Sequence, residues 1–537
     1  MKLAAIQQRP IVGNIDANLN LIRQAMALAK EQGAMGVVTP ELFLLGYPPR
    51  DLVSHPDTMG AITQALMQLQ DLTKEWGVDC WVGAPALSSG RRLFNSLYLF
   101  SQGQQVHRWD KQLLPFYDVF DDPRYFVSGS PTTVIQHRGM RWGVLICEDA
   151  WADMYPDDYT MNPITQIQEQ SPDMVLIPTA SPFEVDKTTR RFGVLSRLAK
   201  RVSCPVLMVN QVGGQDDVVY AGSTMLLNAH GDLCMQCPDF WDGVRVIDLA
   251  ATGSSIPLVT SHPIQQQLDA IKMSIRDYVN SNGAGSVLVG VSGGIDSAVT
   301  LVLAADALGP ERVHAVFMPS GITSSESARD AFDLAHRLGV QYTDISIQPM
   351  LDEAIRGLPS PMEGVPIENL QARIRGCLLM TLANRDGGLV LTTGNKSEYA
   401  MGYCTLYGDM VGAFAPLKDV YKTQVMAMAQ YLNQQDSRIP TYTIERPPTA
   451  ELREGQVDQD VLPPYDILDA ILVKLIDERL GISQLIQDGV SPELASWVYD
   501  RLHRYEYKRF QSPHGVKLSR TAFGGGRRMP ITGVMPA

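Results

Sequence analysis

Alternating helix and strand patterns predict an α/β protein made of two domains, each with its own sheet. The chain has 537 residues, which is more than one hydrophobic core usually organises. A helical pattern leads into a strand near the start, and a strand, a glycine loop and a helix follow one another again from residue 286. Small and turn-forming residues interrupt the pattern at 251–257, between the two halves.

The first half begins with an amphipathic helix and continues as a series of strands. Leu19, Ile22, Met26 and Ala29 recur at helical spacing, and 36–41 then has the pattern of a strand. Further β-rich runs, separated by helical or loop stretches, lie at 78–83, 97–100, 141–146, 174–178 and 205–209. The first half is therefore predicted to be α/β.

The second half alternates strands with helices from residue 286 to about residue 435. Because successive parallel strands need crossover helices, this order predicts a parallel sheet with helices on both faces. We expect domains at 1–250 and 265–537, joined by a linker at 251–264. The Gly-Gly-Gly-Arg-Arg run at 524–528 predicts a mobile tail.

The overall composition limits the partners that the protein can have. The formal net charge of −13 argues against broad contact with a nucleic-acid backbone. Seven cysteines in so long a chain do not form a disulfide framework, and the first residues lack the apolar run of a signal peptide. No apolar stretch approaches membrane-spanning length. We expect a soluble, cytoplasmic protein that binds small molecules.

Three polar residues at predicted strand ends form the first candidate site. Cys147 follows the apolar run 142–146, Glu41 closes the strand that starts at Val37, and Lys111 follows a short strand. A thiol becomes a working nucleophile when a base takes its proton and a positive group stabilises the oxyanion that forms on the carbonyl. Each residue alone is usually a surface charge or a core side chain. The three together predict a nucleophile, a base and an oxyanion-stabilising lysine.

Segments 39–41, 111–115 and 146–149 resemble, in their order, the three motifs of the nitrilase superfamily. The resemblance covers roughly residues 1–250 and implies an α-β-β-α sandwich. It also implies that Glu41 is the general base, Cys147 the nucleophile and Lys111 the residue that stabilises the tetrahedral intermediate. The residues that resemble the glutamine-holding positions of glutaminase members are Tyr117, Ser181 and Lys187.

A glycine loop forms the second candidate site. Residues 286–291 are an apolar, strand-like run, and Ser-Gly-Gly-Ile-Asp-Ser at 292–297 follows directly before an apolar helix. Glycines let the backbone approach phosphates closely, and the helix N-terminus favours negative charge. The loop matches neither the Walker pattern nor the dinucleotide fingerprint. Asp296 would repel phosphate, so a bridging Mg²⁺ is the sensible reason for a carboxylate there.

This loop resembles that of the N-type ATP pyrophosphatases, which cut between the α and β phosphates and have a Rossmann-like parallel sheet. Later segments at 393–398, 407–409, 415–422 and 448–452 resemble the NAD synthetase family, so that the resemblance covers most of 265–530. The implied ATP-binding residues are Gly290, Val291, Ser292, Gly293, Gly294, Ile295, Asp296, Ser297, Thr393, Lys422 and Thr449. The implied contacts to deamido-NAD are Asn369, Glu398, Asp409 and Lys508, and the implied Mg²⁺ ligands are Asp296 and Glu398.

Together the two resemblances imply a coupled reaction. The cysteine site would release ammonia from glutamine, and the second site would use ATP to adenylate the nicotinate carboxylate of deamido-NAD before ammonia attacks it. The products would be NAD, AMP, pyrophosphate and glutamate. We expect ATP with Mg²⁺, no tightly bound organic cofactor, and a homo-oligomer.

Two other functions remain open. One is a GMP-synthetase-like amidotransferase that acts on a base carbonyl, although the glutaminase of such enzymes usually differs in kind from a nitrilase domain. The other is a protein whose first domain is only a scaffold or regulator, or that makes ammonia alone. The presence of Glu41, Lys111 and Cys147 together argues against a scaffold.

Overall fold

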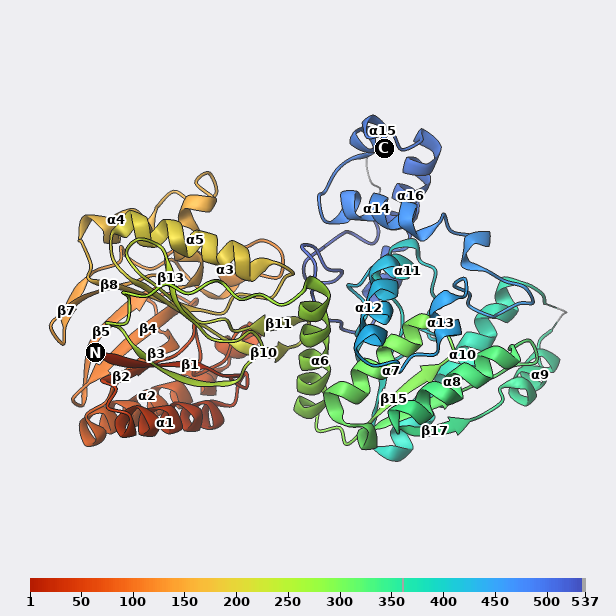
Figure 1. Cartoon of the computed structure of the whole chain (residues 1–537), viewed down its shortest axis with the longest axis horizontal. Helices are drawn as coiled ribbons and strands as arrows, with labels where there is room; N and C mark the ends of the chain where they lie inside the picture. Colours follow the sequence, from red (N-terminus) through yellow and green to blue (C-terminus); the bar gives the residue numbers. More distant parts are fainter. Residues whose placement is uncertain (360–361, 534–537) are drawn as a thin grey trace. The chain divides into compact units, whose positions relative to one another are not determined.

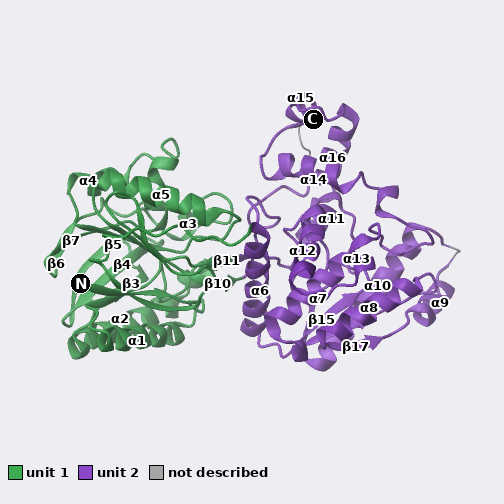
Figure 2. Cartoon of the chain, viewed as in Figure 1, with its two compact units in different colours: residues 1–215, 219–262 green, residues 216–218, 263–537 purple. Residues whose placement is uncertain are grey.

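The computed structural model describes residues 1–359 and 362–533. The chain forms two compact units: unit 1 comprises Met1–Gln215 and Val219–His262, and unit 2 comprises Asp216–Val218 and Pro263–Ala537 (Figure 2). Within the part that the structure describes, no helix is both long enough and apolar enough to cross a membrane.

Unit 1 contains two six-stranded sheets (Figure 1). The first has the order β14 (Gly243–Asp248), β1 (Lys2–Gln7), β2 (Gly36–Val38), β3 (Asp79–Ala86), β4 (Phe94–Ser101) and β5 (Gln104–Asp110). The second has the order β13 (Leu233–Gln236), β12 (Met225–Leu227), β9 (Val206–Asn210), β8 (Met174–Thr179), β7 (Met140–Val144) and β6 (Ile135–His137). A separate pair is formed by β10 (Val212–Gln215) and β11 (Val218–Ala221).

The two sheets of unit 1 pack face to face and are covered by helices on their outer faces. Trp81 of β3 and Trp142 of β7 meet between the sheets with ring centroids 5.4 Å apart, inside one apolar cluster that both sheets supply. Helices α1 (Ile15–Glu31) and α2 (Pro56–Trp76) cover the first sheet, and α4 (Pro163–Glu169) and α5 (Lys187–Val202) cover the second. The predicted α-β-β-α sandwich is confirmed.

Helix α1 illustrates how the local sequence directs this packing. Asn14 caps it by accepting a hydrogen bond from the amide of Ala17, and its apolar stripe, which includes Leu19, Ile22 and Met26, is buried. The helix therefore begins at its polar cap and turns the predicted apolar face toward the sheet. The remaining short elements of unit 1 are η1 (Arg50–Ser54), α3 (Asp122–Tyr125) and η2 (Cys147–Met154).

Unit 2 is built on a four-stranded parallel sheet. The strand order is β17 (Gln341–Asp344), β16 (Val313–Phe317), β15 (Val287–Val291) and β18 (Leu389–Leu391). Around it lie α6 (Pro263–Ser281), α7 (Ile295–Leu308), η3 (Pro310–Arg312), α8 (Ser325–Leu338), α9 (Gln348–Arg356), α10 (Val365–Asp386), α11 (Lys396–Met401) and α12 (Lys422–Gln435). The chain continues through α13 (Thr441–Glu445), η4 (Asp458–Asp460), α14 (Tyr465–Ile476), α15 (Ile482–Gln487), α16 (Pro492–Arg504) and α17 (Glu506–Phe510).

The sheet of unit 2 has helices on both faces, as predicted (Figure 1). Leu288 of β15, Val316 of β16 and Val390 of β18 pack with Leu379 of α10 in one apolar cluster, while α7 contacts β15 and β16. Because the strands are parallel, the carboxyl ends of β15 and β18 lie at one edge of the sheet, where ligands bind in open α/β sheets.

The segment at 524–528, predicted to be a mobile tail, instead makes specific contacts. The Arg527 guanidinium donates to Glu506 Oε2 at 2.8 Å and lies over the ring of Phe523, which is buried. The ion pair and the buried ring hold this segment against α17, and neither partner could be read from the glycine-rich sequence.

Candidate active sites

The predicted nucleophile, base and lysine of unit 1 follow three different strands. Glu41 comes after β2, Lys111 directly follows β5, and Cys147 starts η2 after β7. The side chains of Glu41 and Lys111 are fully buried, and Cys147 is only 5% exposed. Cys147 has φ of 49°, a left-handed conformation that is uncommon for a residue with a side chain and that clusters at functional sites.

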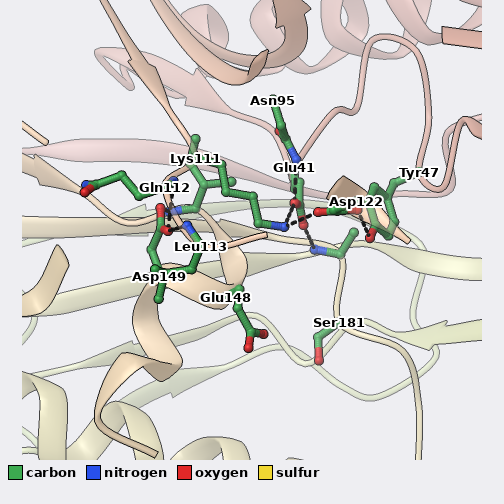
Figure 3. A network of polar contacts seen from close by, with 12 residues as sticks. Glu41, Tyr47, Asn95, Lys111, Gln112, Leu113, Asp122, Glu148, Asp149 and Ser181 are labelled. Atoms are coloured by element: carbon green, nitrogen blue, oxygen red, sulfur yellow. Dashed lines mark hydrogen bonds and ion pairs between the residues drawn. The ribbon is translucent and has the colours of Figure 1, made fainter. Parts of the chain in front are cut away.

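One carboxylate joins the loops that carry the lysine and the cysteine. Asp149 Oδ1 accepts hydrogen bonds from the amides of Gln112 and Leu113 at 3.1 and 2.8 Å, and its Oδ2 accepts one from the amide of Ile146 at 3.1 Å (Figure 3). A single side chain thus accepts hydrogen bonds from two backbone amides after Lys111 and from one before Cys147. Asp149 therefore fixes the two loops together.

Lys111 is held between two carboxylates. Its Nζ donates to Glu41 Oε1 at 2.7 Å and to Asp122 Oδ2 at 2.8 Å (Figure 3). Asn95 Nδ2 donates to the same Glu41 oxygen at 2.8 Å, and the Ala180 amide donates to Glu41 Oε2 at 3.1 Å. These four donated hydrogen bonds fix the positions of the Glu41 carboxylate and of the Lys111 ammonium group.

The charges of the site keep the lysine protonated and the thiol neutral. Burial alone would lower the pKa of Lys111, but Asp122 and Glu41 overcome this effect and hold it well above its ordinary value. Burial raises the pKa of the Cys147 thiol and the charge of Glu41 raises it further, while Lys111 opposes them. The thiol consequently needs a base to become a nucleophile, and Glu41 is the carboxylate that acts on it most strongly.

Two of the three residues expected to hold glutamine lie around Glu148, the residue after Cys147. Tyr117 donates its hydroxyl to Glu148 at 3.0 Å, and Tyr159 donates to Glu148 Oε1 at 2.9 Å. Burial raises the pKa of Glu148, and Lys187 is one of the groups that lower it. Ser181 is nearly buried in the loop after β8 (Figure 3).

Several residues of this site were missed by the sequence analysis. They are Asn95, Asp122, Glu148 and Tyr159. Glu148 could have been found, since an acidic residue directly follows the cysteine in segment 146–149. The other three carry no local pattern and reach the site only through the fold.

The glycine loop of unit 2 joins the carboxyl end of β15 to the N-terminus of α7, as predicted. Gly293 has φ of 75°, and a Cβ there would lie 2.6 Å from the carbonyl oxygen of Ser327, so only glycine fits. The Ser297 hydroxyl donates to the carbonyl of Gly294 at 2.9 Å, and the Gly294 amide donates to Ser292 Oγ at 3.3 Å. The loop is therefore held in a tight turn by its own hydroxyl groups.

Lys422 also lies between carboxylates, but these line an open cavity. Its Nζ contacts Asp296 Oδ2 and lies 3.6 Å from Glu398 Oε1, and Asn395 Nδ2 donates to Asp296 Oδ1 at 2.9 Å. Burial and the charge of Asp296 hold the pKa of Glu398 well above its ordinary value, while Lys422 lowers it. Burial also raises the pKa of Asp458. Three carboxylates thus surround one ammonium group.

One cavity of unit 2 brings together most of the residues predicted there. The predicted residues that line it are Gly290, Val291, Ser292, Gly294, Asp296, Ser297, Thr393, Glu398, Asp409, Lys422 and Thr449. Residues that the sequence analysis did not name, among them Arg375, Glu451 and Asp458, line it as well.

Four of the predicted residues are not among those that line the cavity. Gly293 faces Ser327, and Ile295 is buried as the first residue of α7. The Thr405 hydroxyl donates to Asn369 Oδ1 at 2.7 Å, and Lys508 Nζ donates to the carbonyls of Gly402 and Cys404 at 2.8 and 2.6 Å. Both side chains therefore hold the loop between α11 and Asp409, and Thr405 and Asp409 of this region line the cavity.

The donors around the glycine loop fit a magnesium ion that shares its ligands with a nucleotide. Among residues 1–359 and 362–533, no three His, Cys, Asp or Glu side chains are grouped to hold a metal by themselves. Mg²⁺ usually takes one or two carboxylates and completes its shell with phosphate oxygens and water. Asp296 and Glu398, both beside the loop, provide that number.

Comparison with known proteins gives matches to both units. Residues 2–256 match the carbon-nitrogen hydrolase family, and residues 267–512 match the NAD synthase family. The chain is 40% identical over 540 residues to the glutamine-dependent NAD(+) synthetase of Acinetobacter baylyi, covering 99% of this chain and 98% of that protein. It is 38% identical over 550 residues to the enzyme of that name from Synechocystis, covering 98% of each.

A solved structure is similar over the whole chain. The glutamine-dependent NAD+ synthetase from Acinetobacter baumannii, in complex with adenosine diphosphate, has a TM-score of 0.77 and 38% sequence identity. The similarity covers 99% of this chain and 98% of that one.

Proposed function

The chain belongs to the glutamine-dependent NAD(+) synthetase family, and from this we propose that its two sites divide the reaction between them. The enzyme makes NAD from deamido-NAD in an ATP-dependent reaction with glutamine as the nitrogen donor. We assign glutamine hydrolysis to residues 1–250 and the synthetase reaction to 265–537, with 251–264 as the linker. The pairing of Lys111 Nζ with Glu41 Oε1 at 2.7 Å, beside a buried cysteine, carries the first assignment.

In the first site, Glu41 accepts the proton of the Cys147 thiol as the sulfur attacks the side-chain carbonyl carbon of glutamine. The resulting oxyanion is stabilised by the ammonium group of Lys111, which two carboxylates keep protonated. When the tetrahedral intermediate collapses, the C–N bond breaks and Glu41 returns the proton to the departing ammonia. A water molecule activated by Glu41 then cleaves the thioester and frees glutamate.

Glutamine itself would be held by Tyr117, Ser181 and Lys187. The hydrogen bond from Tyr117 to Glu148 and the influence of Lys187 on the pKa of Glu148 support a common location for Tyr117 and Lys187. Opposite charges at Glu148 and Lys187 suit the ammonium and carboxylate groups of an amino acid.

In the second site, an oxygen of the nicotinate carboxylate attacks the α-phosphorus of ATP and pyrophosphate leaves. This step is needed because a free carboxylate is a very poor electrophile toward ammonia. Ammonia then attacks the carbonyl carbon of the adenylate, and AMP leaves with the electrons of the broken C–O bond. The Ser292–Ser297 loop, with Thr393, Lys422 and Thr449, would hold ATP, and Asn369, Asp409 and Lys508 would position deamido-NAD directly or through the loop they support.

Asp296 and Glu398 would hold Mg²⁺ together with the phosphates. When bound, the ion would neutralise the charge that develops between the α and β phosphates. Asp296 keeps its carboxylate beside the loop through Asn395 Nδ2 at 2.9 Å. Glu398 Oε2 accepts a hydrogen bond from the amide of Asn395 at 3.2 Å. Both proposed ligands therefore have defined positions before Mg²⁺ binds.

We further propose that the enzyme works in the cytoplasm as a homo-oligomer. The seven cysteines, all in the described part of the chain, are free thiols, as expected in a reducing compartment. Light scattering of the purified protein tests the assembly state.

The substrate assignment is tested by giving the enzyme ATP, Mg²⁺ and ammonia with either deamido-NAD or xanthosine monophosphate. We expect AMP and pyrophosphate to form with deamido-NAD but not with xanthosine monophosphate. Turnover of xanthosine monophosphate instead would identify a GMP-synthetase-like enzyme with the same adenylation chemistry.

The division between the sites is tested with Cys147→Ala. This variant should lose glutamine-supported NAD synthesis and keep the ammonia-supported reaction, because the thiol acts only in making ammonia. An equal loss with both nitrogen donors would refute the two-site assignment.

A further inference from the structure

Arg375 lies on the face of α10 that borders the nucleotide cavity. Ala372, Arg375, Gly376 and Leu379 all line this cavity, at spacings that place them on one side of the helix. A Cβ on Gly290 would lie 3.1 Å from Leu379, so this part of α10 is close to the carboxyl end of β15, where the glycine loop begins. Arg375 therefore shares its cavity with the predicted phosphate-binding loop.

One hydrogen bond orients the guanidinium group. Arg375 Nε donates to the carbonyl oxygen of Met318 at 2.9 Å, just after β16. This contact uses one of the five N–H groups of the side chain. Within residues 1–359 and 362–533, Nη1 and Nη2 make no hydrogen bond and can donate to a ligand. Among the described residues, no carboxylate lies within ion-pair distance of Arg375.

The charge of Arg375 is incompletely balanced. Burial lowers its pKa to about 10, and Glu451 is the carboxylate that opposes this effect. Glu451, however, already accepts hydrogen bonds from the hydroxyls of Ser324 and Ser327 at 2.9 and 2.7 Å. It also lies 3.7 Å from the guanidinium group of Arg446. Glu451 therefore pairs with Arg446 and acts on Arg375 only from beyond ion-pair distance.

A partly desolvated cation without a close counter-ion is costly unless an anion binds there. A guanidinium group with two free N–H edges matches the geometry of a phosphate group. We propose that Arg375 binds a phosphate group of ATP through Nη1 and Nη2, with Met318 setting its orientation. The inference rests on the proposed assignment of the Ser292–Ser297 loop to ATP.

Two substitutions separate phosphate binding from a purely structural role. Arg375→Gln keeps a donor at the position of Nε, where it can still bond to Met318, and removes the charge and both Nη groups. Arg375→Lys keeps the charge and loses the Nε donor. If the side chain only holds α10 against the end of β16, Arg375→Lys should weaken ATP binding more than Arg375→Gln does. If it binds phosphate, Arg375→Gln should weaken ATP binding more.

The experiment measures equilibrium binding of ATP, adenosine and deamido-NAD, each alone, to the full-length wild-type and variant proteins. We expect Arg375→Gln to raise the Kd for ATP by about tenfold to 150-fold, the usual effect of losing a hydrogen bond between charged groups. Adenosine and deamido-NAD should bind as before, and Arg375→Lys should recover part of the ATP affinity. Arg385→Gln is the matched control, because Arg385 lies on the same helix, is 61% exposed and pairs with Asp386.

Several results would overturn the proposal. Equal weakening of adenosine and ATP would show that Arg375 supports the nucleoside pocket or the fold. If only deamido-NAD bound more weakly, Arg375 would contact a phosphate of deamido-NAD rather than one of ATP. Unchanged ATP binding in Arg375→Gln would exclude the contact while leaving the proposed function intact. If the wild-type protein failed to bind ATP at all, the proposed function of the cavity would be wrong, and the assignment of Arg375 with it.

Discussion

Asp122 is a positioning residue whose removal should impair glutamine hydrolysis alone. Its Oδ2 accepts a hydrogen bond from Lys111 Nζ at 2.8 Å, and its Oδ1 accepts one from the Tyr47 hydroxyl at 2.9 Å (Figure 3). In Asp122→Asn only one oxygen remains, so the side chain can satisfy either Tyr47 or Lys111. With Tyr47 satisfied, the new NH₂ group faces the Lys111 ammonium, and two donors oppose each other.

The size of the effect follows from the contacts that Lys111 keeps. It loses one of two buried hydrogen bonds to carboxylates, and such a bond to a charged group contributes about 1.5–3 kcal/mol. Lys111 is then held by Glu41 alone, so its ammonium group is less firmly positioned for the oxyanion. If the whole loss appears in the transition state, kcat/KM for glutamine falls by about tenfold to 150-fold.

The assay compares NAD formation from glutamine with NAD formation from ammonia in the same preparation. We expect the ammonia-supported rate of Asp122→Asn to match that of the wild type. The control is Asp51→Asn, because Asp51 is 77% exposed and its pair with Arg124 at 3.5 Å lies in water. Wild-type glutamine activity in Asp122→Asn would refute the reasoning that Asp122 holds Lys111 in place for catalysis.

The remaining predictions concern unit 2. Asp296→Asn should reduce AMP formation at least about a hundredfold with either nitrogen donor, while glutamine hydrolysis continues in part; wild-type AMP formation would remove the loop from the ATP site. Chelation of Mg²⁺ with EDTA should stop AMP formation and leave glutamine hydrolysis, and added Mg²⁺ should restore it; activity that persists in EDTA would contradict the assigned carboxylate roles. Burial raises the pKa of Asp409 to about 6, so its contribution to the free energy of unfolding is present below its unfolded pKa and is lost as pH rises through the folded one. Between about pH 3 and pH 7, the wild type should therefore lose about 3 kcal/mol relative to Asp409→Asn in urea denaturation, and parallel pH profiles would contradict this.

The fold class could be predicted because its signals are local. The apolar stripe of α1 and the succession of β15, glycine loop and α7 are each contained in a short stretch of sequence. The same holds for Glu398, since Asn395 and Glu398 form a capping box at the start of α11. Such patterns depend only on neighbouring residues.

The partners of the catalytic groups could not be predicted in this way. Lys111 meets Glu41 across 70 residues of sequence, and Asn95 meets Glu41 across 54. Asp122 lies near Lys111 in the chain, but nothing in its surroundings indicates that its side chain turns inward. Lys508 lies in a segment with a local pattern, but only the fold shows that its ammonium group donates to the carbonyls of Gly402 and Cys404.

Each site places one lysine among carboxylates, and the surroundings of the two lysines differ. Lys111 and Glu41 are fully buried, so their side chains are held in place before glutamine binds. The side-chain amide of glutamine is neutral, so its binding needs no additional ion. Around Lys422 the carboxylates of Asp296 and Glu398 are 16% and 17% exposed and border the cavity. While both carboxylates face Lys422, the lysine offers little net positive charge to a triphosphate. A cation that draws them away would leave Lys422 free to face phosphate, which is why loss of either Asp296 or Mg²⁺ should disable the same step.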